Sequence, residues 1–468
     1  MPYIPHTAED TGAMLKRIGA PNIEALFDEI NPTLRQKAFE NLPDGLNEMA
    51  LLQHAEACSR KNKNTTCFIG AGSYDHHIPA AVWDIASRGE FLTAYTPYQA
   101  EASQGTLQLL YEFQTMIAEL TGMEVANASM YDGATALAEA VLMAIRIKRK
   151  HKTRRVLVPE TLHPLYRETL ETILQHQDVT LITLPMDTTE GITALTSLDA
   201  YCNDEITALI IAQPNFFGGL ESVDALSDWA HAHQIISIAC VNPISLGLLK
   251  PPGAWGSQGV DIVCGEGQPL GAPMAAGGPY VGFFSTKREH VRHMPGRLIG
   301  RTTDLDGKPG YTLTLQAREQ HIRRAKATSN ICTNQGLLTT TATIHMSLLG
   351  PEGLARVAHQ CHNNTHKLVD ALTTVPGVHL VFNTPFFHEA LLQLPCSARN
   401  IVHTLAEQGI AAGYITEQHY THFPNTLLVC ATESRTDTEI QTFANALQHS
   451  VATENRTRSQ TPLMETPS

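Results

Sequence analysis

Hydrogen-bond donors are dense between residues 95 and 105, where the segment reads Tyr-Thr-Pro-Tyr-Gln-Ala-Glu-Ala-Ser-Gln-Gly. Tyrosine hydroxyls, side-chain amides and the positive end of a helix dipole could together bind a phosphate or a small carboxylate. A proline-fixed turn leading into an N-capped helix explains the same residues equally well. The candidate binding residues are Tyr95, Thr96, Tyr98, Gln99, Ser103, Gln104 and Gly105.

A second polar cluster lies in residues 70–77, Gly-Ala-Gly-Ser-Tyr-Asp-His-His. His76 and His77 beside Asp75 suggest a metal site. Neighbouring side chains of an extended segment point in opposite directions, so one ion rarely binds both histidines. We therefore expect a loop and no metal. A dinucleotide-binding turn is also excluded, because no long strand precedes the glycines and no acid follows at the required distance.

The elements that would position these residues alternate between strand and helix through the middle of the chain. Such alternation predicts right-handed βαβ units and a mostly parallel sheet covered on both faces. The expected strands are 155–158, 179–184, 207–212, 235–239, 260–264 and 280–284. The expected helices are 105–120, 134–148, 166–175 and 222–233.

The remaining segments predict a division into four parts. Short helical patterns interrupted by prolines predict an N-terminal helical arm at 1–65, followed by a large α/β domain at 66–335. Two long helices, 336–349 and 354–372, begin a smaller C-terminal α+β domain that extends to residue 452. Residues 453–468 are polar and contain proline, which predicts a disordered tail.

This layout is that of pyridoxal phosphate (PLP)-dependent transferases of fold type I, the aspartate-aminotransferase-like class. A PLP site requires a lysine, an acid beside the pyridine nitrogen and a phosphate-binding turn or helix start. The expected acid-bearing strand, 235–244, has no Asp or Glu. The next segment, 260–271, has no lysine, and Gln268 stands where the lysine is needed. The sequence therefore predicts no active PLP site in this chain.

Four other lysines lie between the sheet and the second long helix: Lys250, Lys287, Lys308 and Lys326. Each is interpreted as a solvated surface charge, because lysine is rarely buried without a partner. Lys326 lies in a cationic segment that could also hold an anion or the carboxylates of a neighbouring subunit.

Long blocks of this sequence, in order, resemble the glycine cleavage P-protein family, in the form whose polypeptide is divided into two subunits. The resemblance is to the N-terminal subunit and runs from residue 3 to about 446. The blocks that carry it are 68–79, 94–99, 103–105, 126–133, 265–271, 277–280, 315–324 and 326–335.

The resemblance implies that the PLP lysine belongs to the other subunit, in a His-Lys-Thr-Phe segment leading to a Gly-Gly-Pro turn. The corresponding turn here is 277–279, and counting back from it places the lysine position at Gln268. It implies an α2β2-type assembly in which the lysine-bearing subunit binds PLP. The implied reaction is decarboxylation of glycine and transfer of the aminomethyl group to lipoylated H-protein. It implies that this chain has no catalytic residue of its own. From the density of hydrogen-bond donors in residues 95–105, we expect this loop to line the mouth of the partner's active site.

Composition is consistent with a soluble globular enzyme subunit. The chain has 468 residues, 43% of them hydrophobic and 17% charged, with a net charge of −13. This charge disfavours nucleic acid and anionic membranes as partners. The nine cysteines form no CxxC pair, and we find no leader or membrane-spanning run, so we expect a reduced, cytoplasmic protein. Two alternatives stay open, a self-sufficient PLP enzyme with an unconventional lysine and a non-catalytic scaffold.

Overall fold

The computed structural model describes residues 5–35, 42–92 and 95–460. The chain divides into two compact units, residues 1–64 and residues 65–468. The boundary coincides with the predicted end of the N-terminal arm. The predicted large and small domains both lie in the second unit.

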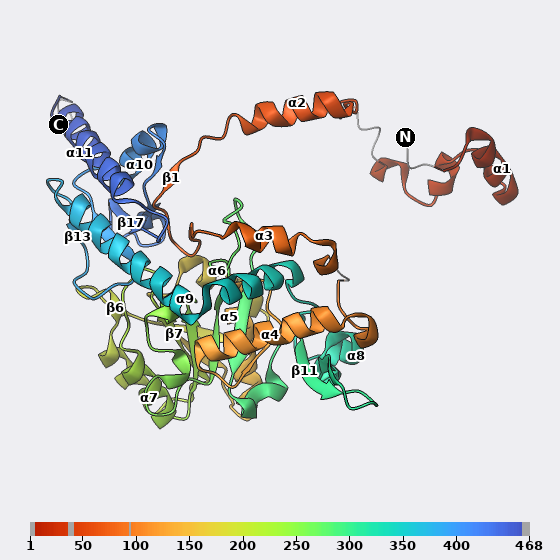
Figure 1. Ribbon diagram of the computed structural model, residues 1–468, viewed down its shortest axis with the longest axis horizontal. Helices are drawn as coiled ribbons and strands as arrows, with labels where there is room; N and C mark the ends of the chain where they lie inside the picture. The colour runs from red at the N-terminus through yellow and green to blue at the C-terminus, as the bar shows by residue number, and fades with distance from the viewer. Residues whose placement is uncertain (1–4, 36–41, 93–94, 461–468) are drawn as a thin grey trace. The chain divides into compact units, whose positions relative to one another are not determined.

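The N-terminal unit consists of short helices, as predicted. They are α1 (Ala8–Ile18), η1 (Glu24–Phe27), η2 (Pro32–Leu34) and α2 (Glu48–Ser59) (Figure 1). Helix α1 begins in a capping box, in which Thr7 and Asp10 satisfy each other's backbone amides. None of these four helices has a buried residue. The unit therefore has no hydrophobic core of its own.

The second unit contains a seven-stranded sheet in the order β2-β10-β9-β8-β7-β3-β4. Strand β10 is antiparallel to both neighbours, and the remaining pairs are parallel. All six strands predicted between residues 155 and 284 are present, so the expected α/β class is confirmed. The strands are β2 (Val125–Ala126), β3 (Arg155–Pro159), β4 (Thr180–Leu184), β7 (Ala208–Gln213), β8 (Ile236–Val241), β9 (Ile262–Glu266) and β10 (Gly282–Thr286).

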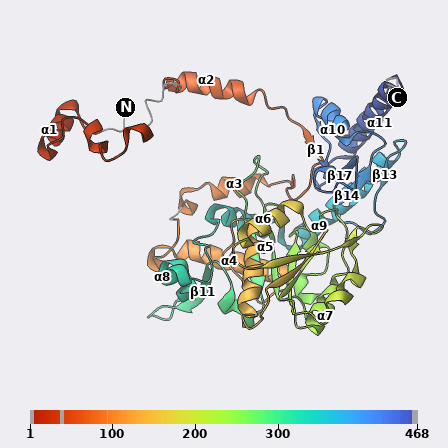
Figure 2. The same cartoon turned by 180° about the vertical axis from the view of Figure 1, so that it is seen from behind.

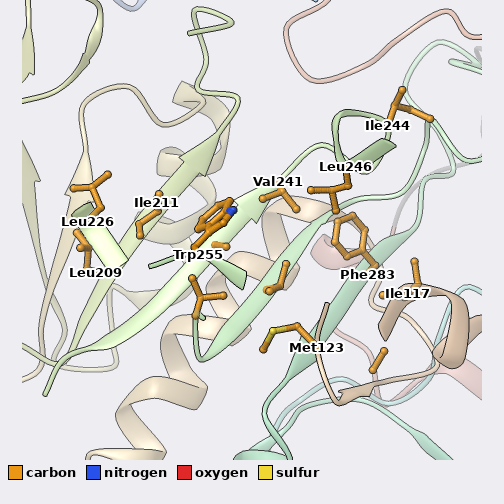
Figure 3. Packing of buried hydrophobic residues seen from close by; sticks show 14 of the residues in the cluster. Ile117, Met123, Leu209, Ile211, Leu226, Val241, Ile244, Leu246, Trp255 and Phe283 are labelled. Carbon is orange, nitrogen blue, oxygen red and sulfur yellow. The ribbon is translucent and has the colours of Figure 1, made fainter. Parts of the chain in front are cut away.

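Helices cover both faces of this sheet (Figures 1 and 2). Successive residues of β7 point to opposite faces, and all are buried. Leu209 and Ile211 pack with α4 and α7, whereas Ile210 and Ala212 pack with α5 and α6. In the first of these cores Trp255 lies beside Ile211 and Val241 (Figure 3). The helices are α4 (Gln104–Thr121), α5 (Gly133–Ile147), α6 (Pro164–Leu174) and α7 (Val223–Ala232).

The C-terminal part begins with α9 (Gly336–Thr373), which contains both predicted long helices. Gly350, at φ 60°, interrupts the helix directly before Pro351, so the predicted break is confirmed. An antiparallel sheet follows in the order β13-β14-β17-β16 and packs on α10 (Ala398–Glu407) and α11 (Asp437–Gln460) with a core of its own. Its strands are β13 (His379–Leu380), β14 (Glu389–Gln393), β16 (Tyr414–Ile415) and β17 (Thr426–Cys430).

The predicted disordered tail is wrong for its first eight positions. Helix α11 continues to Gln460, and residues 461–468 lie outside the described residues. Val451 is buried against the small-domain core, so the helix is already docked where the tail was predicted to begin. Within the described residues, no helix is long and apolar enough to cross a membrane.

Several short elements were not predicted from the sequence. The hairpin β11 (Leu298–Thr303) and β12 (Pro309–Thr314) lies beside α4, and α8 (Gln320–Arg323) follows it. Strand β1 (Thr66–Cys67) pairs with β15 (Ile410–Ala411), so the first strand of the second unit is joined to its C-terminal part. The others are α3 (Ala80–Ala86), β5 (Met186–Asp187) and β6 (Ile192–Thr193).

Candidate functional site

A small cleft lies at the carboxyl ends of β3, β7, β8 and β9, where open α/β sheets place their ligands. Its volume is about 70 Å³. It is lined by Gly72, Tyr74, Leu162, His163, Tyr166, Ala212, Pro214, Asn215, Phe216, Cys240, Val241, Asn242, Glu266 and Glu389. This set includes no lysine and no residue of the segment 95–105.

Gln268, the predicted lysine position, lies just after β9 and is 1% exposed. Its Nε2 donates hydrogen bonds to the carbonyls of Tyr74 (3.0 Å) and Ala272 (2.7 Å). Its Oε1 accepts a hydrogen bond from Tyr74 N at 3.0 Å. Both donors and the acceptor of the amide are therefore satisfied. Gln268 is a structural link between the loop 70–77 and the turn after β9.

Glu266, the last residue of β9, occupies the start of helix α5. Its Oε2 accepts a hydrogen bond from Gly133 N (2.8 Å), and its Oε1 accepts from Gln268 N (2.9 Å) and Val281 N (3.1 Å). A helix start is the usual place for a phosphate in such folds. A Cβ on Gly133 would lie 2.7 Å from Glu266 N, so the helix packs directly against the strand end. Burial raises the pKa of Glu266 to about 7.

A second buried acid, Glu389 at the start of β14, closes the other side of the cleft. Its Oε1 accepts a hydrogen bond from Ala71 N (2.6 Å), and its Oε2 accepts one from the Tyr74 hydroxyl (2.8 Å). Burial raises the pKa of Glu389 to about 7. His163 lies across the same loop with Nε2 2.8 Å from the carbonyl of Ala71, and burial lowers its pKa.

These residues do not fit PLP. The expected acid-bearing strand ends in Cys240, Val241 and Asn242, so no carboxylate faces the cleft from β8. Lys250 pairs with Asp224 (2.9 Å) and Lys287 with Asp261 (2.8 Å), whereas Lys308 and Lys326 are exposed. Glu266 occupies the helix start that a phosphate would need, and no lysine lines the cleft.

The segment 95–105 forms a separate feature around Arg297, a residue that the sequence interpretation missed. The Arg297 Nη2 donates hydrogen bonds to Thr96 Oγ1 (3.2 Å) and to the Tyr98 hydroxyl (3.3 Å). It also donates to the carbonyl of Cys332, and its Nη1 pairs with Glu319. The guanidinium carbon lies 5.2 Å from the centroid of the Tyr98 ring. Arg297 is 2% exposed, so it anchors the loop from beneath.

The other predicted loop residues lie toward solvent. Tyr95 is 75% and Tyr98 51% exposed, and Gln99, Gln104 and Gly105 are exposed as well. Gln104 exchanges two hydrogen bonds of 2.8 Å with the backbone of Tyr311 in β12. Ser103 is the N-cap of α4, but its side chain makes no capping hydrogen bond. The alternative prediction of an N-capped helix is therefore confirmed only in part.

A hollow of about 450 Å³ lies beside this loop. Tyr95, Tyr131, Thr333 and Asn334 line it together with the first turn of α9. The sulfur of Cys332 lies 3.3 Å from the Tyr95 hydroxyl and 3.4 Å from the Tyr131 hydroxyl, and these contacts lower the pKa of its thiol. Of the predicted donors, Tyr95 lines this hollow, and none of them lines the small cleft.

The sequence contained partial signals for the residues that were missed. Glu266 lies two positions before Gln268 in a block that was singled out, but its contact with Gly133 spans 133 positions. Arg297 meets Thr96 across 201 positions, and Glu389 meets Tyr74 across 315. The local periodicity of a sequence gives no information about contacts between residues so far apart.

Comparison with known proteins identifies the family. The glycine cleavage system P-protein family matches residues 1–447. The chain belongs to this family.

The P-protein relatives cover almost the whole chain. A probable glycine dehydrogenase (decarboxylating) subunit 1 of Legionella pneumophila is 67% identical over 96% of this chain and 98% of its own length. The protein with the same description from Nitrosomonas europaea is 56% identical over 97% of this chain and 99% of its own length. The resemblance inferred from the sequence is confirmed.

Solved structures confirm the predicted fold class. The crystal structure of a glycine decarboxylase (P-protein) of the glycine cleavage system, in inhibitor-bound form, superposes with a TM-score of 0.86 at 42% identity. It covers 96% of this chain and 100% of that one. A glutamate decarboxylase from Lactobacillus brevis, 10% identical with a TM-score of 0.68, covers 91% of this chain and 97% of that chain and shares the fold alone.

Proposed function

We propose that this P-protein family member is the subunit that lacks a PLP site in a two-subunit glycine dehydrogenase (decarboxylating), an oxidoreductase of the glycine cleavage system. In the proposed α2β2-type assembly, the second subunit holds PLP and its lysine, decarboxylates glycine and transfers the aminomethyl group to the lipoyl group of H-protein. The description of its relatives as "subunit 1" supports the existence of a partner. One observation supports this assignment of the PLP site to the second subunit. In this chain, Gln268 and Glu266 fill the cleft with internal hydrogen bonds.

The same geometry argues against a self-sufficient PLP enzyme. A substitute lysine would have to enter the cleft from the side chains that line it, and none of these is a lysine. We also propose that the assembly is cytoplasmic. All nine cysteines lie in the described residues and none forms a disulfide, as is usual for a reducing compartment.

We further propose that the loop 95–105 of this chain lies at the mouth of the partner's active site. Its polar side chains, Tyr95, Tyr98 and Gln99, are exposed, while the buried Arg297 keeps their backbone in place. Ordered donors that face outward from a chain without its own site are suited to a ligand held by a neighbour.

The main proposal is tested by locating the cofactor. The purified chain is incubated with PLP, reduced with borohydride and weighed by mass spectrometry, alone and after mixing with the lysine-bearing subunit. We expect an adduct on the partner alone and glycine decarboxylation in the mixture alone. A stoichiometric adduct on this chain would contradict the proposal. The variant Gln268→Lys should also remain unmodified, because Glu266 still occupies the start of α5.

The loop proposal is tested with Tyr98→Phe and Gln99→Ala, each assembled with wild-type partner. We expect the turnover number to fall roughly tenfold for each, which corresponds to about 1.4 kcal/mol of transition-state stabilisation. Gln108→Ala is the matched control, since this exposed amide bonds only to Glu112 on the same helix. Kinetics equal to wild type in both loop variants would rule the loop out, and the chain would then act as a scaffold.

A further inference from the structure

Three side chains that can bind a metal converge outside the cleft. They are His76 in the loop before α3, Cys361 in the second half of α9 and Glu433 after β17. Their candidate ligand atoms all lie within 4.8 Å of one another. His76 Nδ1 is 2.7 Å and Cys361 Sγ 3.2 Å from the same Glu433 oxygen, Oε2. The other oxygen, Oε1, accepts a hydrogen bond from His77 N (2.7 Å), which fixes the carboxylate.

The cluster is secluded from water. The side chains of His76 and Glu433 are 3% and 13% exposed, and Cys361 is fully buried. A nitrogen, a sulfur and an oxygen donor from three distant segments are rarely brought together in a protein interior without a reason. This is the ligand set that Zn²⁺ prefers, since it binds imidazole, thiolate and carboxylate alike.

A second, independent observation comes from neighbouring imidazoles. Within the described residues, His76 Nε2, His345 Nδ1 and His388 Nδ1 are buried and have no hydrogen-bond partner. His345 and His388 are 2% and 0% exposed, and both are within electrostatic reach of His76. Buried polar atoms without partners are uncommon and often mark an ion or a water molecule. The partnerless nitrogens of His345 and His388, in the surroundings of this cluster, are consistent with a bound ion.

We propose that His76 Nδ1, Cys361 Sγ and Glu433 Oε2 bind a single Zn²⁺ ion. When the ion enters, the proton of the Cys361 thiol leaves to solvent. The Cys361 thiolate and the Glu433 carboxylate then balance the two positive charges of Zn²⁺. The loaded site therefore leaves no net charge in a buried region, where an unpaired charge would be costly.

The geometry requires only small movements. Tetrahedral zinc with bonds of 2.0–2.3 Å holds its ligand atoms about 3.4–3.6 Å apart. The separations of 2.7 and 3.2 Å, and the limit of 4.8 Å for the group, lie on either side of that range. The site would join the loop 70–77, which holds Gln268, to α9 and to the small domain. It would be a structural site, independent of the proposed division of catalysis.

The sequence interpretation expected no metal in residues 70–77, because His76 and His77 cannot easily share one ion. That argument is unaffected here, since His77 contributes only its backbone amide. The other two ligands come from positions 361 and 433, which no local spacing connects to residue 76.

The test uses the full-length chain. Metal content is measured by mass spectrometry, and zinc is then removed with a chelator and titrated back by calorimetry, using the matched variants Cys361→Ala and Cys264→Ala. Both remove a buried thiol, but Cys264 lies in the core of β9. We expect about one zinc per chain in the wild type and Cys264→Ala, and at least a tenfold weaker affinity in Cys361→Ala and Glu433→Gln.

Cobalt substitution of the wild type keeps the proposal falsifiable if a variant fails to fold. Co²⁺ should produce a thiolate-to-cobalt charge-transfer band and the strong visible bands of a tetrahedral site. A wild-type chain that neither contains nor takes up zinc would overturn the proposal. So would zinc binding that Cys361→Ala leaves unchanged, or a cobalt spectrum without the thiolate band.

Discussion

Gln268 and Glu389 are buried and Glu266 is half-buried, and the hydrogen bonds of these side chains hold the loop 70–77 and the start of α5 against the sheet. Each bond to a buried backbone amide replaces one that water would make in the unfolded chain. The net gain per bond is about 1 kcal/mol, but an unsatisfied partner costs about 1–3 kcal/mol. The cleft is therefore stable because its hydrogen bonds are complete, without any cofactor to satisfy them.

The pKa of Glu389 leads to a pH-dependent stability. Its pKa is about 7 in the folded chain and 4.5 when exposed, so folding opposes its ionisation. The contribution of this carboxyl to the free energy of unfolding is fully present below about pH 4.5 and is lost as the pH rises through 7. The full shift corresponds to about 3 kcal/mol.

Between pH 5 and pH 8, we expect the free energy of unfolding to fall less in Glu389→Gln than in the wild type. Denaturant titrations at several pH values measure this difference. Glu352→Gln, at a side chain that is 91% exposed, is the matched control and should follow the wild type. Parallel pH profiles for wild type and Glu389→Gln would show that the carboxyl is ionised at low pH in the folded chain.

At the scale of elements, the loop 95–105 depends on a buried ion pair contributed by the β11–β12 region. Arg297 and Glu319 are 2% and 7% exposed and pair with each other. Removing one member of such a pair leaves an isolated charge in the interior, whereas replacing both with apolar residues can be nearly neutral.

Arg297→Met should therefore destabilise the chain by about 3–5 kcal/mol and release Thr96 and Tyr98. The double variant Arg297→Met/Glu319→Met should recover much of the stability but not the ordered loop. Chemical denaturation measures the first effect, and turnover with the wild-type partner measures the second. Equal stability losses in the single and double variants would contradict the isolated-charge explanation.

Elements were predicted well where burial imposes a period. Strands β3, β7, β8, β9 and β10 are almost entirely buried, and the helices between them have one apolar side, so their order along the chain could be predicted. Elements shaped by contacts elsewhere were missed. The hairpin β11–β12 is partly exposed and packs against α4, and helix α11 continues beyond Val451, which packs on the core of the small domain.

At the scale of the whole molecule, the N-terminal unit exposes much apolar surface. Twelve large hydrophobic side chains of residues 1–64 are exposed, and its helices bury none. They are Met14, Ile18, Ile23, Leu26, Phe27, Ile30, Leu34, Leu42, Leu46, Met49, Leu51 and Leu52. Apolar surface of this extent indicates contact with another surface.

We expect deletion of residues 1–64 to leave the second unit folded, because that unit contains all the hydrophobic cores of the described residues. Its melting temperature should change little, whereas its affinity for the lysine-bearing subunit should fall at least tenfold. Calorimetry of the truncated chain and sedimentation of the mixture measure the two effects. Undiminished assembly would show that the arm is not part of the subunit interface.

The sequence by itself predicted the α/β class and the family, which are confirmed, and the order of the central strands along the chain. Its placement of the missing lysine at Gln268 stays a prediction. These properties depend on residue type and on short-range periodicity, which can be read from a single sequence. Only the tertiary structure decided that Glu266 occupies the start of α5, that Arg297 anchors the loop 95–105, and that His76, Cys361 and Glu433 meet. These contacts join residues 72 to 357 positions apart, and only the packing of the folded chain brings such residues together.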